Sequence, residues 1–358
     1  MQFMSQSMGW ADNVILAMAP LGIITAIVSA IRVGGPSWLK ALVGRARENL
    51  AVAEADLMSS TSKEVCELWN GQEVVRCMGS APVSEFICLL PEGMQSTTNP
   101  PAANPPATNP PATNPPATEI IIVRNVSDHA PNISLNSHNQ FGRRELHVVA
   151  VIGTILQLGV LVYSGFATYY PTLKFPKDER PIADYAFPCT ATGTLVLAAG
   201  MLVCAHVVES STKEERYQPA QGKEARLVWL QQTKTVSDQD FKSFAVFAED
   251  NRAVITTSGR ADKQNKLNAF DNGILETNQG HATVLAFKAV IGTFISLSGF
   301  IVQFIGLRGM HWSASITQLG AVLVMVVLKA WVRRGLAQPP RCQPLPSEFE
   351  LDWFAMTL

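Results

Sequence analysis

Residues 284–306 read VLAFKAVIGTFISLSGFIVQFIG, an apolar run whose only charge is Lys288. A helix needs about 20 mostly apolar residues to cross about 30 Å of hydrocarbon, so this run predicts a transmembrane helix. Three further runs resemble it in length and composition, with at most one charge each and aromatic residues near an end. They are residues 147–170, 186–208 and 312–332.

The composition of the chain agrees with a membrane protein. Hydrophobic residues make up 47% of its 358 residues and charged residues 16%, whereas about a quarter of the residues in soluble proteins are charged. The net charge is −1 and no Lys/Arg-rich block occurs, so nucleic acid is excluded as a partner. The six cysteines include no CxxC pair, which argues against a disulfide-dense scaffold.

A fifth run, residues 14–31, is shorter and contains Pro20. It lacks the positively charged start of a secretory signal, and membrane helices tolerate proline. We expect a spanning helix here, with a re-entrant or interfacial segment as the alternative.

The chain is expected to begin with an outside or lumenal N-terminus (1–13) and span 14–31. On the cytoplasmic side follow an amphipathic helix and β-hairpin (32–98), a Pro-rich linker (99–118), and a strand and polar loop (119–146). Spans 147–170 and 186–208 are joined by an outer loop (171–185) and lead to a cytoplasmic α+β segment (209–282). Spans 283–306 and 312–332 are joined by an outer loop (307–311) and lead to a cytoplasmic tail (333–358).

The Lys and Arg residues near the span ends predict the orientation, because cytoplasmic loops carry an excess of both. With about five spans, the larger group falls on the side of residues 32–146, 209–282 and 333–358, so the C-terminus is expected in the cytoplasm. The smaller group comprises Lys174, Lys177, Arg180 and Arg308. The lipid bilayer is therefore an expected partner of a multi-pass protein whose particular membrane is unspecified.

The second and fourth spans contain the same pentapeptide, AVIGT, at residues 150–154 and 289–293. A short outer loop and a return helix follow each copy. We therefore expect a duplicated helical hairpin, with the two copies in parallel orientation.

Small and polar residues form a stripe along one face of each AVIGT span. Close packing of helices requires such small residues, and we expect packing; the alternative is that the stripe lines a solute path. The candidate residues are Gly153, Gln157 and Ser164 on the second span, and Gly292, Ser296, Gly299, Gln303 and Gly306 on the fourth.

The segment after the first run begins with an amphipathic helix from Trp38 to Leu57, which packs on the soluble domain or lies on the inner leaflet. Asn70-Gly71 then predicts a β-hairpin. In the register of a two-residue turn, Cys66 faces Val75, and its sulfur lies too far from that of Cys77 to form a disulfide. We expect no metal site.

The Pro-rich linker is built on the repeat NPPAT. Such a repeat predicts an extended spacer, although a proline-recognition ligand is the alternative. Two glycosylation sequons follow at Asn125 and Asn132; in the cytoplasm they would stay unmodified. Strand-like stretches at 225–230, 241–248 and 253–257 predict that residues 32–146 and 209–282 jointly form one small α+β cytoplasmic domain.

Motifs of known chemistry do not occur: the sequence has no phosphate loop, dinucleotide fingerprint, HExxH or GxSxG. His129 beside Asp128 and the pair Asp238 and Asp240 are the nearest candidates for catalysis, and each is better interpreted as a solvated loop residue. We expect no catalytic residue and no cofactor.

Three stretches resemble a group of uncharacterised fungal multi-pass membrane proteins, some of which carry ankyrin repeats. The stretches begin at Trp10 (WADNVILAMAPLGIITAIVSAIRVGG), Glu64 (EVCELWNG) and Arg226 (RLVWLQQ). The resemblance implies a fungal membrane protein, and it transfers no catalytic or binding residue. The last residues, 349–358, are expected to be the start of a further segment that relatives of the chain would continue.

Two hypotheses of function follow. The first is a non-enzymatic membrane anchor or sensor whose cytoplasmic domain binds another protein, because the inner segments look folded and the spans have no charge at mid-depth. The alternative is a small-solute channel or transporter, favoured by the duplicated hairpin and the stripes that include Gln157 and Gln303. A membrane-bound enzyme is a third, weaker hypothesis. Faces of small residues also favour self-association.

Overall fold

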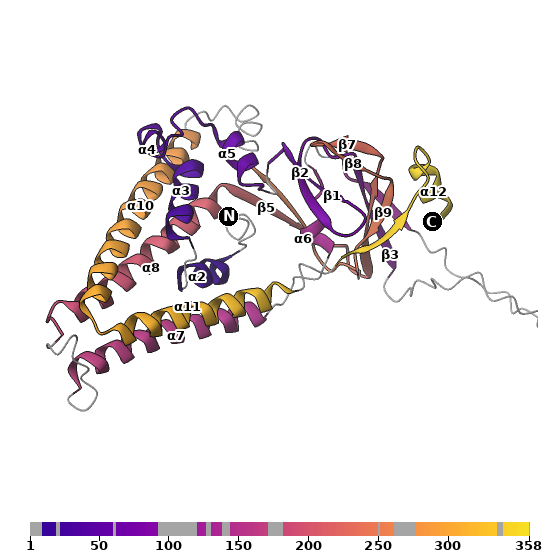
Figure 1. Cartoon of the computed structure of the whole chain (residues 1–358). Helices are drawn as coiled ribbons and strands as arrows, with labels where there is room; N and C mark the ends of the chain where they lie inside the picture. Colours follow the sequence, from indigo (N-terminus) through magenta and orange to yellow (C-terminus); the bar gives the residue numbers. More distant parts are fainter. Residues whose placement is uncertain are drawn as a thin grey trace, which may run out of the picture. The chain divides into compact units, whose positions relative to one another are not determined.

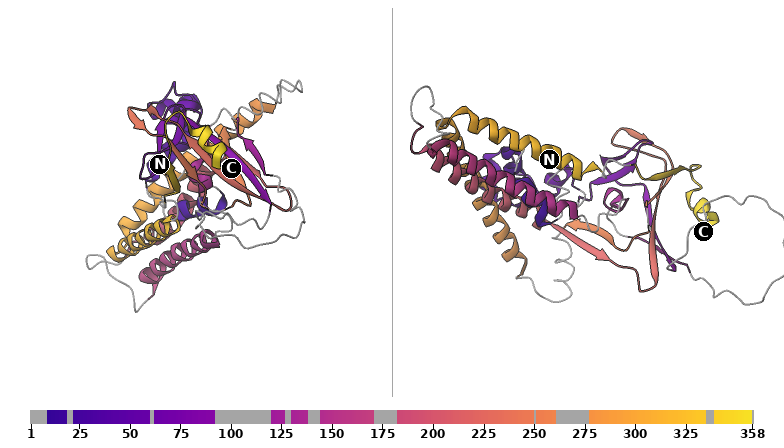
Figure 2. Two further views of the ribbon diagram at one scale, coloured as in Figure 1. Left: turned by 90° about the vertical axis from the view of Figure 1, so that its right-hand side faces the viewer. Right: turned by 90° about the horizontal axis from the view of Figure 1, so that it is seen from below.

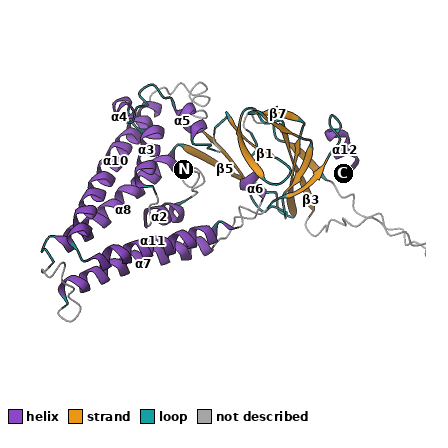
Figure 3. Cartoon of the chain, viewed as in Figure 1, coloured by secondary structure: helices purple, strands orange, loops and turns teal. Residues whose placement is uncertain are grey.

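The computed structural model describes residues 9–18, 22–59, 62–91, 120–126, 130–137, 144–170, 182–249, 251–260, 277–334 and 339–357. The chain divides into two compact units. The helical unit comprises residues 1–65, 142–214 and 258–338, and the sheet unit comprises residues 66–141, 215–257 and 339–358. Figure 3 distinguishes the long helices of the first from the strands of the second.

The helical unit contains four helices that are long and apolar enough to cross a membrane. These helices agree with the four clear spans expected from hydropathy and favour a multi-pass membrane protein. The helices are α7 (Arg144–Tyr169), α8 (Ala186–Ser210), α10 (Thr277–Gly309) and α11 (Trp312–Val332).

The fifth apolar run forms two short helices instead of one long one. They are α2 (Trp10–Met18) and α3 (Ile23–Gly34). Gly22 precedes α3 in the left-handed conformation, with φ 74°, which a continuous helix does not allow. At 1.5 Å per residue, α3 is about 18 Å long, well short of the hydrocarbon thickness. The expectation of one continuous helix over residues 14–31 is therefore wrong.

The four long helices pack as two antiparallel pairs. α8 lies along α10, and α7 lies along α11, as Figure 1 and the view from below in Figure 2 show. α3 packs against α8 and α10, and α2 packs against α7 and α8. The main packing partner of each AVIGT helix is therefore not the return helix of its own predicted hairpin, but the return helix of the other copy.

The predicted amphipathic helix between Trp38 and Leu57 is also divided. Its parts are α4 (Ser37–Leu42) and α5 (Leu50–Asp56). Gly44, with φ 76°, turns the chain between them, and the side chain of Asn49 caps α5 by accepting a hydrogen bond from the backbone N–H of Val52. Separate short helices can present different faces, which one continuous helix cannot.

The sheet unit is built on a five-stranded antiparallel sheet with strand order β11-β9-β6-β3-β4. The central strand β6 pairs with β3 along its whole length, from Val83 opposite Gln231 to Pro91 opposite Lys223. Buried side chains such as Trp229, Leu227 and Val246 form its core. The strands are β3 (Val83–Pro91), β4 (Ile121–Arg124), β6 (Lys223–Gln231), β9 (Phe244–Phe247) and β11 (Arg341–Pro344).

Three segments of the chain supply this sheet, although the sequence predicted two. The third is the C-terminal segment, expected as a separate tail. Its strand β11 pairs with β9, and the helix α12 (Glu350–Thr357) follows. The ring of Phe354 packs on that of Phe86, with centroids 4.6 Å apart. The predicted strand 225–230 lies in β6, whereas 241–248 is divided between two strands.

The remaining strands form three two-stranded sheets. A short helix, α6, packs with the sheet core through Ile133. The paired strands are β1 (Val65–Trp69) with β2 (Val74–Met78), β7 (Lys234–Val236) with β8 (Gln239–Phe241), and β5 (Thr212–Tyr217) with β10 (Ile255–Arg260); α6 covers Ile133–Ser137.

Candidate functional site

The glycines of the stripe on α10 lie against the backbone of α8. A Cβ atom added to Gly299 would overlap the backbone nitrogen of Leu197, and one added to Gly306 would overlap that of Thr190. Gly292 faces Val203 and Cys204, where an added Cβ would come within 3.0 Å of a Val203 methyl group. The absence of side chains at these positions lets the two helices touch.

The polar members of the same stripe bond to α8. Gln303 donates a hydrogen bond from its Nε2 to the hydroxyl of Thr194, at 2.9 Å. The hydroxyl of Ser296 lies 3.7 Å from the sulfur of Cys204. These side chains therefore satisfy each other within the contact, as polar groups in hydrocarbon must.

The candidate residues on the other AVIGT helix face a different partner. Gly153 on α7 lies against Met325 of α11. Gln157 and Gln318 exchange two hydrogen bonds between their amides, at 3.3 and 3.4 Å. Ser164 is fully buried, and its hydroxyl has no hydrogen-bond partner among the described residues. The two stripes are thus placed in two separate helix pairs.

Equivalent positions of the two AVIGT copies make equivalent contacts. Gly153 in the first copy and Gly292 in the second each contact the return helix of the opposite copy, through Met325 and Cys204 respectively. The two copies therefore exchange their return helices, and this relation could not be read from the order of the spans along the chain.

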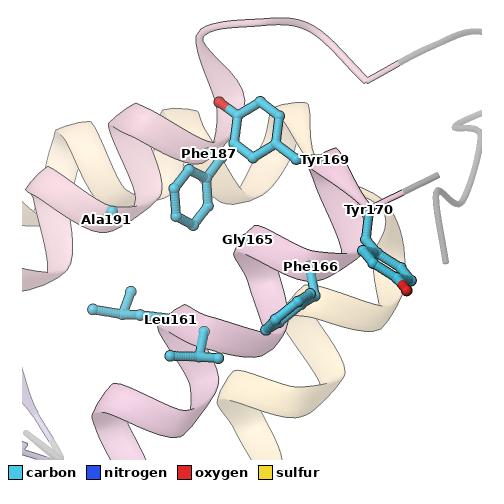
Figure 4. Close-up of a pocket in the computed structure, with 8 residues that line it drawn as sticks. Leu161, Gly165, Phe166, Tyr169, Tyr170, Phe187 and Ala191 are labelled. Atoms are coloured by element: carbon cyan, nitrogen blue, oxygen red, sulfur yellow. The ribbon is translucent and has the colours of Figure 1, made fainter. Parts of the chain in front are cut away.

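A shallow apolar groove of about 540 Å³ lies between α7 and α8, near the end of α7. Gly165 leaves room there for the ring of Phe187, and Tyr169 packs edge-on against the same ring at 5.5 Å (Figure 4). The groove has the character of an aromatic belt at a membrane–water interface. Among the described residues that line it, the polar groups are the phenol hydroxyls of Tyr169 and Tyr170, and there is no carboxylate, imidazole, amine or thiol.

Buried carboxylates in the sheet unit are paired, as burial of charge demands. Glu85 accepts hydrogen bonds from the indole nitrogen of Trp229 at 2.9 Å and from the amide of Asn125 at 2.6 Å. Glu67 binds Arg76 at 2.8 Å and accepts from the backbone N–H of Ser134 at 2.7 Å. These contacts connect separate chain segments within the unit.

Both sequon asparagines are engaged by the fold. The side-chain nitrogen of Asn125, which would carry a glycan, donates the hydrogen bond to Glu85. Asn132 is buried at the start of the turn before α6. Attachment of a glycan would break the hydrogen bond of Asn125 to Glu85 and would require Asn132 to leave its buried position.

Cys66 and Cys77 lie opposite each other in the β1–β2 hairpin. The backbone N–H of Asn70 donates to the carbonyl of Glu73 at 3.1 Å, and this pairing, continued along the strands, places Glu67 opposite Arg76 and Cys66 opposite Cys77. The Glu67–Arg76 ion pair agrees with this register. The predicted register was wrong because the side chain of Asn70 accepts hydrogen bonds from Gln72 and Glu73 and lengthens the turn.

Burial makes the two thiols weak acids. Desolvation raises the pKa of Cys66 to about 11, and it also raises the pKa of Cys77. A thiol reacts through its thiolate, so neither side chain resembles an activated nucleophile. Across the described ranges, no group of three or more His, Cys, Asp or Glu side chains could hold a metal ion.

Two candidates for catalysis remain from the sequence. Asp128 and His129 lie outside the described residues. Asp240 accepts a hydrogen bond from the hydroxyl of Thr235 at 2.6 Å, and Asp238 lies in the β7–β8 turn with φ 63°. These two aspartates belong to a hairpin turn.

A buried ion-pair cluster at the end of α3 was not foreseen. Arg32 binds Glu48 at 2.6 Å and Asp56 at 2.8 Å, and both Arg32 and Glu48 are almost fully buried. The cluster fastens α3 to the segment that holds α4 and α5. The sequence indicated only a cation at the end of the apolar run 14–31, because the acidic partners of Arg32 lie 16 and 24 residues further along the chain.

Comparison with family models, curated proteins and solved structures found no match for this chain.

Proposed function

We propose that the protein is a non-enzymatic membrane anchor or sensor whose sheet unit binds another protein in the cytoplasm. The observation that carries this proposal is the edge strand β4. Its residues Ile122 and Val123 alternate between the two faces of the sheet, yet they are 41% and 44% exposed, and Val126 beyond them is 85% exposed. Within the described residues β4 pairs with β3 alone, so its other edge is suited to accept an extended strand of a partner.

The order of the spans supports one side for the whole sheet unit. Its three segments are separated by α7 with α8 and by α10 with α11. An even number of crossings returns the chain to the same side each time. The segments can therefore assemble into one unit on that side, and the distribution of Lys and Arg favours the cytoplasm.

The N-terminal helices fit a re-entrant segment better than a fifth span. α2 has 9 residues and α3 has 12, so that at 1.5 Å per residue each is far shorter than about 30 Å. We place the N-terminus on the same side as the sheet unit, in place of the lumenal position expected from five spans. The resemblance to fungal multi-pass proteins stays a proposal on the stretches quoted above.

The polar groups inside the spans support a structural role. Gln157 bonds to Gln318, and Gln303 bonds to Thr194. A solute path would need such amides to face a lumen, whereas here they join helices. This arrangement favours an anchor over the alternative of a channel or transporter.

Crosslinking in native membranes tests the proposal. The double substitution Ile122→Lys and Val123→Lys places charges on the exposed edge, which lysine tolerates well, and it should remove the crosslinks between the sheet unit and its partner. The matched control is Met356→Lys, an apolar position on α12 that is 80% exposed. Crosslinks that persist unchanged in the β4 variant, with the unit still folded by hydrogen exchange, would sink the proposal.

A further inference from the structure

Two apolar side chains on α4 are left exposed although the helix is firmly attached. Trp38 is 55% exposed and Leu42 is 76% exposed; four residues apart, they lie on one face of the helix. Leu39 is fully buried in the core that α3 shares with α8 and α10. The exposed face is therefore held in a fixed orientation by its buried neighbour.

The position of α4 along the spans follows from the contacts of Gly34, the last residue of α3 and three residues before α4 begins. Gly34 is pressed against Val207 and Leu285, which an added Cβ would approach to 2.6 and 3.1 Å. Val207 lies three residues from the end of α8, and Leu285 lies at the start of the apolar run 284–306 of α10. α4 therefore begins at the depth where both spans leave the hydrocarbon, which is where tryptophan is enriched in membrane proteins.

All the charged side chains of residues 37–47 are positive. Residues 37–47 include Lys40, Arg45 and Arg47 and contain no carboxylate. The next acidic residue, Glu48, is buried in its ion pair with Arg32. Arg45 is about half exposed while it contacts Asp56 at 3.5 Å, and Arg47 is exposed and forms no ion pair within the described residues.

We propose that residues 37–47 bind the surface of the bilayer and select anionic phospholipids. Trp38 and Leu42 enter the boundary between head groups and acyl chains. Lys40, Arg45 and Arg47 contact the phosphate and carboxylate groups of the lipids around them. Each of the two interactions is typical of interfacial helices, and the buried Leu39 holds the segment where both can form. This surface does not depend on the partner proposed for β4.

Tryptophan quenching tests the insertion. The full-length protein is reconstituted in nanodiscs that contain phosphatidylcholine and phosphatidylserine, and the emission of the Trp38→Phe variant is subtracted from that of the natural chain. The difference signal should be quenched by lipids brominated on their acyl chains and protected from iodide in the buffer. Quenching by iodide with no effect of brominated lipid would overturn the insertion of Trp38.

Lipid selectivity tests the charged part. Spin-labelled phosphatidylserine should be retained around the natural protein over spin-labelled phosphatidylcholine, and this preference should fall in Arg45→Gln/Arg47→Gln. The single variant Arg47→Gln leaves the Arg32 cluster intact, so a smaller fall there separates lipid binding from misfolding. The control Lys234→Gln/Lys242→Gln removes two exposed cations from the sheet unit. Equal preference in the natural chain and both arginine variants, or an equal fall in the control, would refute anionic selection by this surface.

Discussion

Gly299 illustrates how much a single residue contributes when its side chain is absent. It lies directly against the backbone of α8 at Leu197, so that van der Waals attraction, rather than a hydrophobic driving force, holds the helices together in lipid. Gln157 contributes in the opposite way, through a polar side chain whose amide bonds to Gln318 of α11. Each contact depends on one neighbouring group, the backbone at Leu197 or the amide of Gln318, so substitution of Gly299 or Gln157 should break it.

Replacing Gly299 with Leu should separate α8 from α10. Overpacking of this kind costs about 1–3 kcal/mol, and the free energy of unfolding measured by SDS titration in mixed micelles should fall by at least that much. Gly320→Leu is the matched control on α11, where nothing lies within 4 Å of the added Cβ. A loss of stability no greater at position 299 than at position 320 would contradict the close contact.

Replacing Gln157 with Leu should destabilise the α7–α11 pair, because Gln318 is left without its partner. Hydrogen bonds between membrane helices contribute about 0.6 kcal/mol on average and up to about 1.7 kcal/mol. The double variant Gln157→Leu/Gln318→Leu should recover part of the loss, since both amides are then gone. A double-mutant cycle of unfolding free energies measures this coupling, and strictly additive losses would argue against the pair.

At the scale of elements, the sequence predicted those helices whose position depends on hydropathy alone. The four long spans were predictable because length and apolar content are sufficient for a helix in lipid. The break between α2 and α3 was not, because it depends on the left-handed conformation of Gly22. The hairpin of Cys66 was predicted, but its register was not, since the side chain of Asn70 changes the turn.

The corrected register predicts that Cys66 and Cys77 form a disulfide when an oxidant is added. Opposed residues in an antiparallel pair have Cα atoms about 4.5–5.5 Å apart, within the range of disulfides. Diamide accepts the two thiol hydrogens. Because burial raises the pKa of Cys66 to about 11, the thiolate is scarce at pH 7, and the rate of bridging should increase as the pH approaches that value.

Mass spectrometry of the peptides would identify the bridge. Cys88 belongs to a different core cluster of the sheet unit, with Phe86 and Val228, and should not join it. A mixture of Cys66–Cys88 and Cys66–Cys77 products in the folded protein would contradict the register.

At the scale of the whole molecule, the sheet unit draws on segments that the spans separate. The sequence predicted that two of the three segments combine, because each contains strand-like runs. It could not predict the third: β11 has only four residues, and they find their partner in β9 (Phe244–Phe247), almost a hundred residues earlier. Such pairing depends on long-range contacts that local patterns do not encode.

Removal of residues 339–358 should therefore destabilise the sheet unit. β9 loses its neighbour β11, and Phe86 loses the ring of Phe354; truncation of one buried Phe side chain alone costs about 3–5 kcal/mol. Hydrogen exchange should accelerate in β9 and β6 and stay slow in α8 and α10. Removal of residues 355–358 alone keeps Phe354 and serves as the control. Unchanged exchange in β9 after the longer truncation would show that the segment is dispensable.

The exchange of return helices between the AVIGT copies has a consequence for assembly. Each two-span half of the helical unit supplies one helix to each pair, because α7 packs on α11 and α10 packs on α8. Neither pair can therefore form within one half alone. The pair α8–α10 joins the halves by contact between glycine and backbone, and the pair α7–α11 joins them by a bridge between paired glutamines.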